Sequence, residues 1–189
     1  MERGRGPAGL RSRLLDPADA AGMAAHGRTE AAVLVALSGS PEDPGILFTE
    51  RRHDLRRHAG EISFPGGRRD TPEEDLMATA LREAQEEVGL DPAAVEILGA
   101  LPPIGTFVTS YKVHPYVGLV PEGAQLDPNP LEVASLLRFR VSALREAFAM
   151  RRLVRHGVPL RTPTYLIGDN LVWGATARIL GELLDRFDP

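Results

Sequence analysis

The sequence of 189 residues has no cysteine, one tryptophan and no apolar run of the length that a membrane-spanning helix needs. Without cysteine the chain has no disulfide framework, no thiolate nucleophile and no sulfur-ligated zinc or iron–sulfur site. Its 22 Lys+Arg against 26 Asp+Glu give a net charge of −4. That balance argues against general binding of nucleic acid or of an anionic membrane, so we expect neither partner.

The composition, with 43% hydrophobic and 25% charged residues, is that of an ordinary globular chain. We expect residues 1–30 to form a partly ordered N-terminal arm with one short helix, and residues 31–189 to form a single domain. The sequence shows neither a secretion signal nor a C-terminal peroxisomal tripeptide, which predicts a cytoplasmic protein.

Lysine is nearly absent too, because every basic residue except Lys112 is an arginine. The simplest interpretation is the codon bias of a GC-rich genome. The functional alternative is that guanidinium groups bind phosphate in two-point contacts that an ammonium group cannot make. Only the placement of particular arginines separates the two.

Apolar patterning and turn residues predict a mixed set of strands and helices. The expected strands are 31–37, 46–49, 61–64, 95–101, 113–120 and 164–167, and the expected helices are 71–88, 141–150 and 173–187. For the first helix we expect Thr71 as the N-cap, Pro72 at the first helical position and Gly89 just after the end. The strands do not alternate regularly with helices, so an α+β or α/β/α domain is predicted and a doubly wound fold is not.

The most informative helix carries several glutamates on one side. Glu83 and Glu87 are four residues apart and share a face, and Glu86 borders it. Like charges at this spacing destabilise a bare helix by a few tenths of a kcal/mol per pair, so a cation is expected to offset them. Mg²⁺ or Mn²⁺ suits carboxylate oxygens. The alternative is a solvated acidic face paired with arginines.

Residues 67–90 resemble the Nudix box, G-x5-E-x7-R-E-U-x-E-E-x-G-U. Two features depart from it: Ala84 replaces a bulkier aliphatic residue, and the loop before the helix is one residue longer. The first glutamate of the box is therefore either Glu73 or Glu74. The resemblance implies the Nudix fold, an α/β/α sandwich with a mixed β-sheet and a catalytic loop–helix–loop. It also implies that Arg82 has a structural role, pairing with one of those two glutamates.

Members of the family hydrolyse a nucleoside diphosphate linked to another group, and they use a divalent metal. By resemblance, Glu83 and Glu87 are the main ligands of Mg²⁺ or Mn²⁺, with Glu86 as a third ligand or as a group that orients water. We expect Glu86 and Glu87 to take part in catalysis. Gly66 and Gly67 form a loop whose backbone approaches the substrate or the metal closely.

Upstream, residues 47–67 resemble the signature of the coenzyme A diphosphatase branch, L-L-T-x-R-[SA]-x3-R-x3-G-x3-F-P-G-G. Arg51 and Arg56 fall in register, and we expect both to bind substrate phosphate. His58 either binds phosphate or forms a hydrogen bond within its own loop. Arg52 replaces a small residue of the signature and is interpreted as a surface arginine.

Further along, Glu132 matches in position a glutamate that in many Nudix proteins closes over the site and serves as a metal ligand or a base. The alternative is an ordinary carboxylate at the N-terminus of a helix or in a loop. Residues 172–178 resemble the start of the closing helix of the same branch, so the resemblance spans about residues 31–184.

The sequence thus predicts metal-dependent hydrolysis of coenzyme A or a derivative to 3′,5′-ADP and 4′-phosphopantetheine, by a monomer or a homodimer. Two alternatives stay open. One is a Nudix hydrolase of another substrate, such as ADP-ribose, NADH or a nucleoside triphosphate. The other is a ligand-sensing Nudix module without activity.

Overall fold

The computed structural model describes residues 7–54, 60–106, 110–155 and 158–187. The helices are α1 (Pro7–Arg11), α2 (Pro17–Gly22), α3 (Leu76–Val88), α4 (Val141–Ala147) and α5 (Gly174–Phe187), with a 3-10 turn at Pro92–Ala94. The strands are β1 (Thr29–Ser38), β2 (Gly45–Arg51), β3 (Ile62–Ser63), β4 (Gly66–Arg68), β5 (Glu96–Ala100), β6 (Ile104–Gly105), β7 (Tyr111–Leu119), β8 (Val133–Arg140), β9 (Phe148–Arg155), β10 (Val158–Ile167) and β11 (Asn170–Val172). None of these described helices is long and apolar enough to span a membrane.

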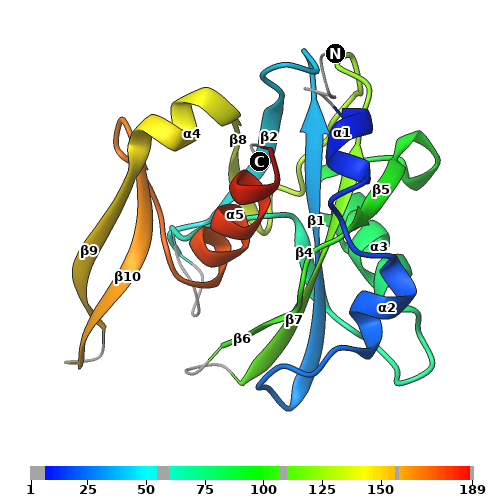
Figure 1. Cartoon of the computed structure of the whole chain (residues 1–189), viewed down its shortest axis with the longest axis horizontal. Helices are drawn as coiled ribbons and strands as arrows, with labels where there is room; N and C mark the ends of the chain where they lie inside the picture. Colours follow the sequence, from blue (N-terminus) through cyan, green and yellow to red (C-terminus); the bar gives the residue numbers. More distant parts are fainter. Residues whose placement is uncertain (1–6, 55–59, 107–109, 156–157, 188–189) are drawn as a thin grey trace.

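The main sheet is mixed and has β1 at its centre (Figure 1). Its order is β3-β2-β1-β7-β5, with β4 paired to β1, β6 to β7 and β8 to β2. β1 runs parallel to β7 over its length and antiparallel to β2 and β4. This arrangement confirms the predicted α+β architecture with a mixed sheet.

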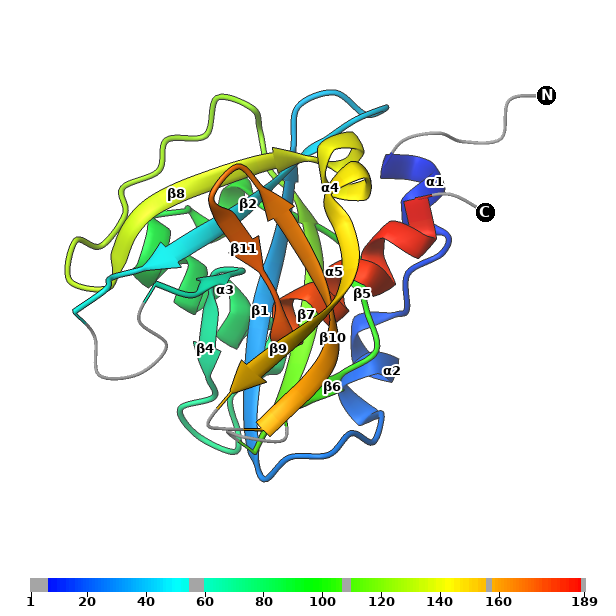
Figure 2. The same ribbon diagram turned by 90° about the vertical axis from the view of Figure 1, so that its left-hand side faces the viewer.

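Helices cover both faces of the sheet, which explains why residues 31–37 are apolar without alternation. Ala32 and Leu34 pack in the cluster that contains the buried face of α3. Val35 and Leu37 point the other way, into the cluster that contains α5. The three layers are therefore α3, the sheet and α5, as an α/β/α sandwich requires (Figures 1 and 2).

A second, three-stranded sheet with the order β11-β10-β9 corrects one expectation. The helix predicted for 141–150 ends at Ala147, and the chain continues as strand β9. Along β9, Phe148, Met150 and Val154 are 51%, 46% and 69% exposed and stand an even number of residues apart, which places them on one face of the strand. The predicted strand 164–167 is the end of the longer strand β10. The sequence does not predict strand β8, residues Val133–Arg140. Figure 2 shows the β9–β10 hairpin in front of α5.

The start of α3 also differs from the prediction. Its N-cap is Asp75, whose side chain accepts hydrogen bonds from the backbone amides of Met77 and Ala78 at 2.9 and 3.0 Å. Thr71 and Pro72 lie in the preceding turn. The end was predicted correctly, since Gly89 adopts the left-handed conformation with φ 68°.

The N-terminal segment lies against the domain. Leu10 of α1 and Ala20 of α2 are each 2% exposed, and Leu15 forms an isolated antiparallel bridge with Ala100.

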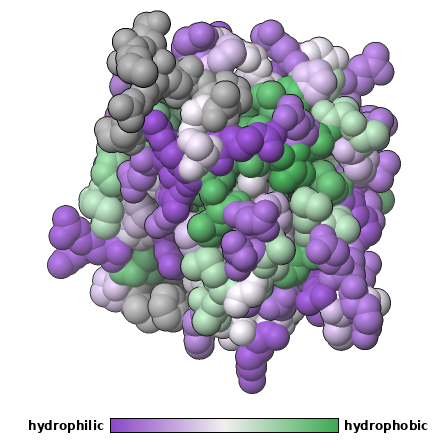
Figure 3. All heavy atoms as spheres, turned by 45° about the vertical axis from the view of Figure 1, so that its right-hand side comes forward, coloured by the Kyte–Doolittle hydropathy of each residue, from purple (hydrophilic) through white to green (hydrophobic). Residues whose placement is uncertain are grey.

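The face seen in Figure 3 shows apolar side chains between polar ones.

Candidate functional site

The site forms where β4 meets α3, and two glycines let them approach. A side chain on Gly66 would collide with the backbone of β1, and one on Gly67 would collide with the carboxylate of Glu83. Gly66 also has φ 154°, which side chains rarely adopt. Its amide donates a hydrogen bond of 3.1 Å to Oε2 of Glu87. The two glycines, which the sequence places in a loop, lie in strand β4 and are in direct contact with the two predicted metal ligands.

The two glutamates are poorly solvated. The side chain of Glu83 is 17% exposed and that of Glu87 is 6% exposed. Burial raises the pKa of Glu83 above its ordinary value. Burial also raises the pKa of Glu87 to about 7, against the hydrogen bond from Gly66 and the charge of Arg51, which lower it. Their negative charge is therefore only partly compensated by the protein.

Arg51, at the end of β2, connects two carboxylates from distant parts of the chain. Its Nη1 lies 3.4 Å from Oε1 of Glu87, and its Nη2 lies 3.9 Å from Oε2 of Glu132. Its Nε is buried and has no hydrogen-bond partner among the described residues. The fold thus brings the predicted residues Arg51, Glu87 and Glu132 together, although they are far apart in sequence. The catalytic role of Glu132 stays a prediction.

Arg82 contacts three carboxylates at and before α3. Its Nε donates a hydrogen bond of 2.9 Å to Glu74, so Glu74, and not Glu73, is the partner that the sequence left open. Its Nη1 donates to Glu83 at 2.9 Å and to Glu86 at 3.3 Å. The Glu86 side chain is 59% exposed and points to Arg82. Its role as a third ligand or water-orienting group stays a prediction.

The donor set fits a hard divalent cation. Glu83 and Glu87 offer carboxylate oxygens beside the two glycines of β4, and Glu132 places another carboxylate on the guanidinium of Arg51. Oxygen ligands of this kind suit Mg²⁺ or Mn²⁺. Among the described residues no three acidic or imidazole side chains are already gathered as a preformed metal cage. A cation held here would therefore rest on Glu83 and Glu87, with other oxygens completing its coordination.

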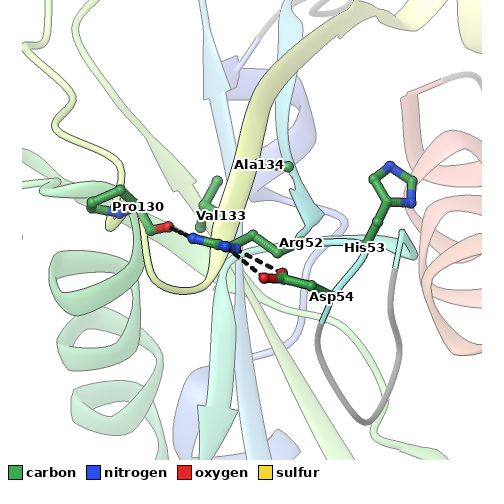
Figure 4. Close-up of a pocket in the computed structure, with 6 residues that line it drawn as sticks. All are labelled: Arg52, His53, Asp54, Pro130, Val133 and Ala134. Atoms are coloured by element: carbon green, nitrogen blue, oxygen red, sulfur yellow. Dashed lines mark hydrogen bonds and ion pairs between the residues drawn. The ribbon is translucent and has the colours of Figure 1, made fainter.

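Two predicted substrate-binding residues, Arg56 and His58, lie outside the described residues. Arg52 has the surface role expected of it. It forms hydrogen bonds of 2.8 and 2.6 Å with Asp54 and one of 2.6 Å with the carbonyl of Pro130 (Figure 4).

These contacts form part of the wall of a hollow of about 470 Å³, lined by Arg52, His53, Asp54, Pro130, Val133 and Ala134. The hollow borders the site, because Arg51 and Glu132 directly precede two of its lining residues. It does not contain the buried carboxylates. An ion pair between Arg52 and Asp54 lies in its wall.

Sequence reasoning did not single out Arg69 or Glu30. Their side chains form an ion pair of 3.3 Å beside the turn that leads into α3. Neither residue belongs to a defined position of the motifs, and their pairing depends on the register between β1 and β4. No signal in the sequence could have found it.

Comparison with known proteins agrees with this geometry. The NUDIX domain family matches residues 28–156. An uncharacterized Nudix hydrolase NudL of Pectobacterium atrosepticum is 39% identical over 163 residues, covering 84% of this chain and 82% of that protein. A NudL protein of Cronobacter sakazakii is 41% identical over 159 residues, covering 82% of this chain and 80% of that protein.

Solved structures resemble the fold at low identity. A MutT/nudix family protein from Enterococcus faecalis aligns with a TM-score of 0.57 and 16% identity, over 84% of this chain and 61% of that chain. DR0079 from Deinococcus radiodurans aligns with a TM-score of 0.54 and 14% identity, over 82% of each chain. At such identities the likeness concerns the fold alone. The matched domain, the relatives and the arrangement of the box residues together show that this chain belongs to the Nudix family and is a Nudix hydrolase, an enzyme that acts on pyrophosphate bonds.

Proposed function

We propose that the protein is a metal-dependent diphosphatase of coenzyme A or its derivatives, producing 3′,5′-ADP and 4′-phosphopantetheine. The observation that carries the proposal is the position of Arg51. This arginine belongs to the segment that resembles the coenzyme A diphosphatase signature, and it contacts Glu87, a carboxylate of the Nudix box. The substrate-type signature and the catalytic helix therefore meet at one pair of side chains.

A divalent cation on Glu83 and Glu87 would neutralise charge on the pyrophosphate and supply a nucleophilic water near neutral pH. The chain's own groups do the rest. Arg51 places positive charge where a multiply charged substrate must approach, and its planar fork suits phosphate oxygens. Arg82 fixes the direction of Glu83, and the amide of Gly66 fixes that of Glu87. Glu132 approaches from the other side of Arg51, where a base or a further oxygen ligand would serve.

The first test is identification of the products. Purified protein is incubated with coenzyme A and Mn²⁺ or Mg²⁺, and parallel reactions contain ADP-ribose, NADH or a nucleoside triphosphate. We expect 3′,5′-ADP and 4′-phosphopantetheine, with slower turnover of the other substrates. Faster hydrolysis of ADP-ribose or NADH would overturn the substrate assignment and leave the family intact. Ligand binding without metal-dependent hydrolysis of any substrate would favour a sensing module.

The second test is Glu87→Gln, which keeps the shape of the side chain and removes its charge. We expect turnover to fall by at least about a hundredfold, because loss of a ligand weakens both metal binding and charge stabilisation. The circular dichroism spectrum should stay that of the parent. Parental activity at saturating metal would contradict the assigned role of Glu87.

A further inference from the structure

Within the loop between β4 and α3, residues 69–75, Arg69 makes contacts with both the loop and strand β1. The guanidinium of Arg69 donates through Nε to the carbonyl of Glu74 at 2.6 Å and through Nη2 to the carbonyl of Pro72. Its Nη1 donates to Oε2 of Glu30 at 3.3 Å. Its own backbone amide bonds to the carbonyl of Glu30 at 3.1 Å. Arg69 therefore connects two carbonyls of the loop to the start of strand β1.

Glu30 is itself fixed by a cluster on the β1–β7 pair. Lys112 lies opposite it in the parallel register, and its Nζ is 3.3 Å from Oε1 of Glu30. Nε2 of His114 lies 3.7 Å from the same oxygen. The side chains of Lys112 and His114 are only 15% and 2% exposed. The single lysine of the chain thus contacts the carboxylate with which Arg69 pairs and helps to hold it in place.

The other end of the loop leads to a predicted metal ligand. The carboxylate of Glu74 accepts a hydrogen bond of 2.8 Å from the amide of Asp70 and one of 2.9 Å from Arg82. Arg82 then donates to Oε1 of Glu83 at 2.9 Å. A continuous series of polar contacts consequently runs from Glu30 through Arg69, the loop and Arg82 to Glu83.

We infer that Arg69, anchored by Glu30, is a positioning residue that sets the orientation of the Glu83 carboxylate for metal binding. The inference rests on the proposed metal-dependent function. The loop is one residue longer than the box that it resembles, and a longer loop has more conformational freedom to lose. A guanidinium restricts that freedom because it reaches two carbonyls and a carboxylate at once, which an ammonium group on a flexible stem does not do. Outer groups that orient metal ligands typically contribute about 10–100-fold to metal affinity.

The test compares Arg69→Lys and Glu30→Gln with Arg68→Lys, a matched control on the neighbouring, exposed side chain. Mn²⁺ binding is measured without substrate, by titration calorimetry or by the EPR signal of free Mn²⁺. Thermal unfolding of the metal-free proteins and the metal dependence of kcat are measured in parallel.

We expect Arg69→Lys to weaken Mn²⁺ binding about tenfold, with kcat largely restored at high metal concentration. Glu30→Gln should act in the same direction but less, because Arg69 keeps its two carbonyl contacts. Arg68→Lys should bind Mn²⁺ like the parent. Unchanged Mn²⁺ affinity in Arg69→Lys, with or without a lower melting temperature, would overturn the positioning role. If the parent protein itself binds no Mn²⁺, the proposed function fails first and this inference fails with it.

Discussion

Gly67 shows how much the site depends on a missing side chain. The carboxylate of Glu83 occupies the space where a Cβ on Gly67 would stand. Since this carboxylate is the end of a flexible side chain, it can swing aside when that space is filled. An added methyl group would therefore disturb the predicted ligand without breaking the fold.

We expect Gly67→Ala to lower the affinity for Mn²⁺ and the turnover by about tenfold or more, because the ligand moves, as seen for lost ligand support at other metal sites. The free energy of unfolding should change by less than about 1 kcal/mol, since Gly67 needs no left-handed backbone. Calorimetric Mn²⁺ titration and urea unfolding measure the two quantities.

Gly66→Ala provides the contrast. Its φ is 154°, and a Cβ there would meet the backbone of β1, which cannot swing aside. The free energy of unfolding of this variant should fall by about 1–3 kcal/mol, more than that of Gly67→Ala. Equal stability losses in the two variants would contradict the assignment of Gly67 to the site.

At the scale of elements, helix α3 begins after the N-cap residue Asp75 and not after Thr71, the earlier residue with N-cap preference. Thr71 and Pro72 fit the preferences of a helix start, but the loop that includes them is occupied by the contacts of Arg69 and Glu74. Asp75 follows this loop and satisfies two free amides of the first turn. The contacts of the loop therefore outweigh the local preference of Thr71 and Pro72 for a helix start.

Asp75→Ala should therefore destabilise the protein by about 1 kcal/mol, the usual contribution of an N-cap. Thr71→Ala, at the residue that the sequence favoured, should change stability by less than about 0.5 kcal/mol. Urea unfolding of both variants at pH 7 checks the pair. A larger loss for Thr71→Ala than for Asp75→Ala would show that the cap is wrongly assigned.

The strand β9 is the element that local sequence described least well. Residues 148–150 continue the apolar spacing of α4, so the sequence alone predicts a helix through 150. The strand exists because β10 pairs with it across eight registered positions, from Phe148 with Tyr165 to Arg155 with Val158. The ring of Phe148 also packs on Tyr165 at 5.6 Å. Partners beyond the turn therefore decide the conformation, and a local pattern does not contain them.

At the scale of the whole molecule, the Glu74–Arg82 pair ties the loop to α3 and makes stability depend on pH. The hydrogen bond from Arg82 lowers the pKa of Glu74 from 4.5 to about 2. The folded pKa is lower than the unfolded one, so the contribution is complete above pH 4.5 and is lost as the pH falls through about 2.

We expect Glu74→Gln to lower the free energy of unfolding by about 1–2 kcal/mol at pH 7, a value reduced for partial solvation of the pair. At pH 3 the difference between the variant and the parent should be less than about half as large, because the parent has lost much of the same contribution. Urea unfolding at the two pH values gives both differences. A difference that does not shrink at pH 3 would exclude ionisation of Glu74 as its cause.

By itself, the sequence determined the family, the mixed α/β/α architecture, the buried central strand and the glutamate face of α3. It did so because these features are carried by local periodicity and by residues at fixed spacing. The Glu74 partner of Arg82, the contact of Arg51 with Glu87 and Glu132, the support from Arg69 and Glu30, and the β9–β10 hairpin were decided by tertiary structure. Each of these contacts joins residues that meet only through the register of the strands or the course of a loop. That is the physical reason why a pattern along the chain identifies the glutamate-bearing helix but not the contacts that orient its side chains.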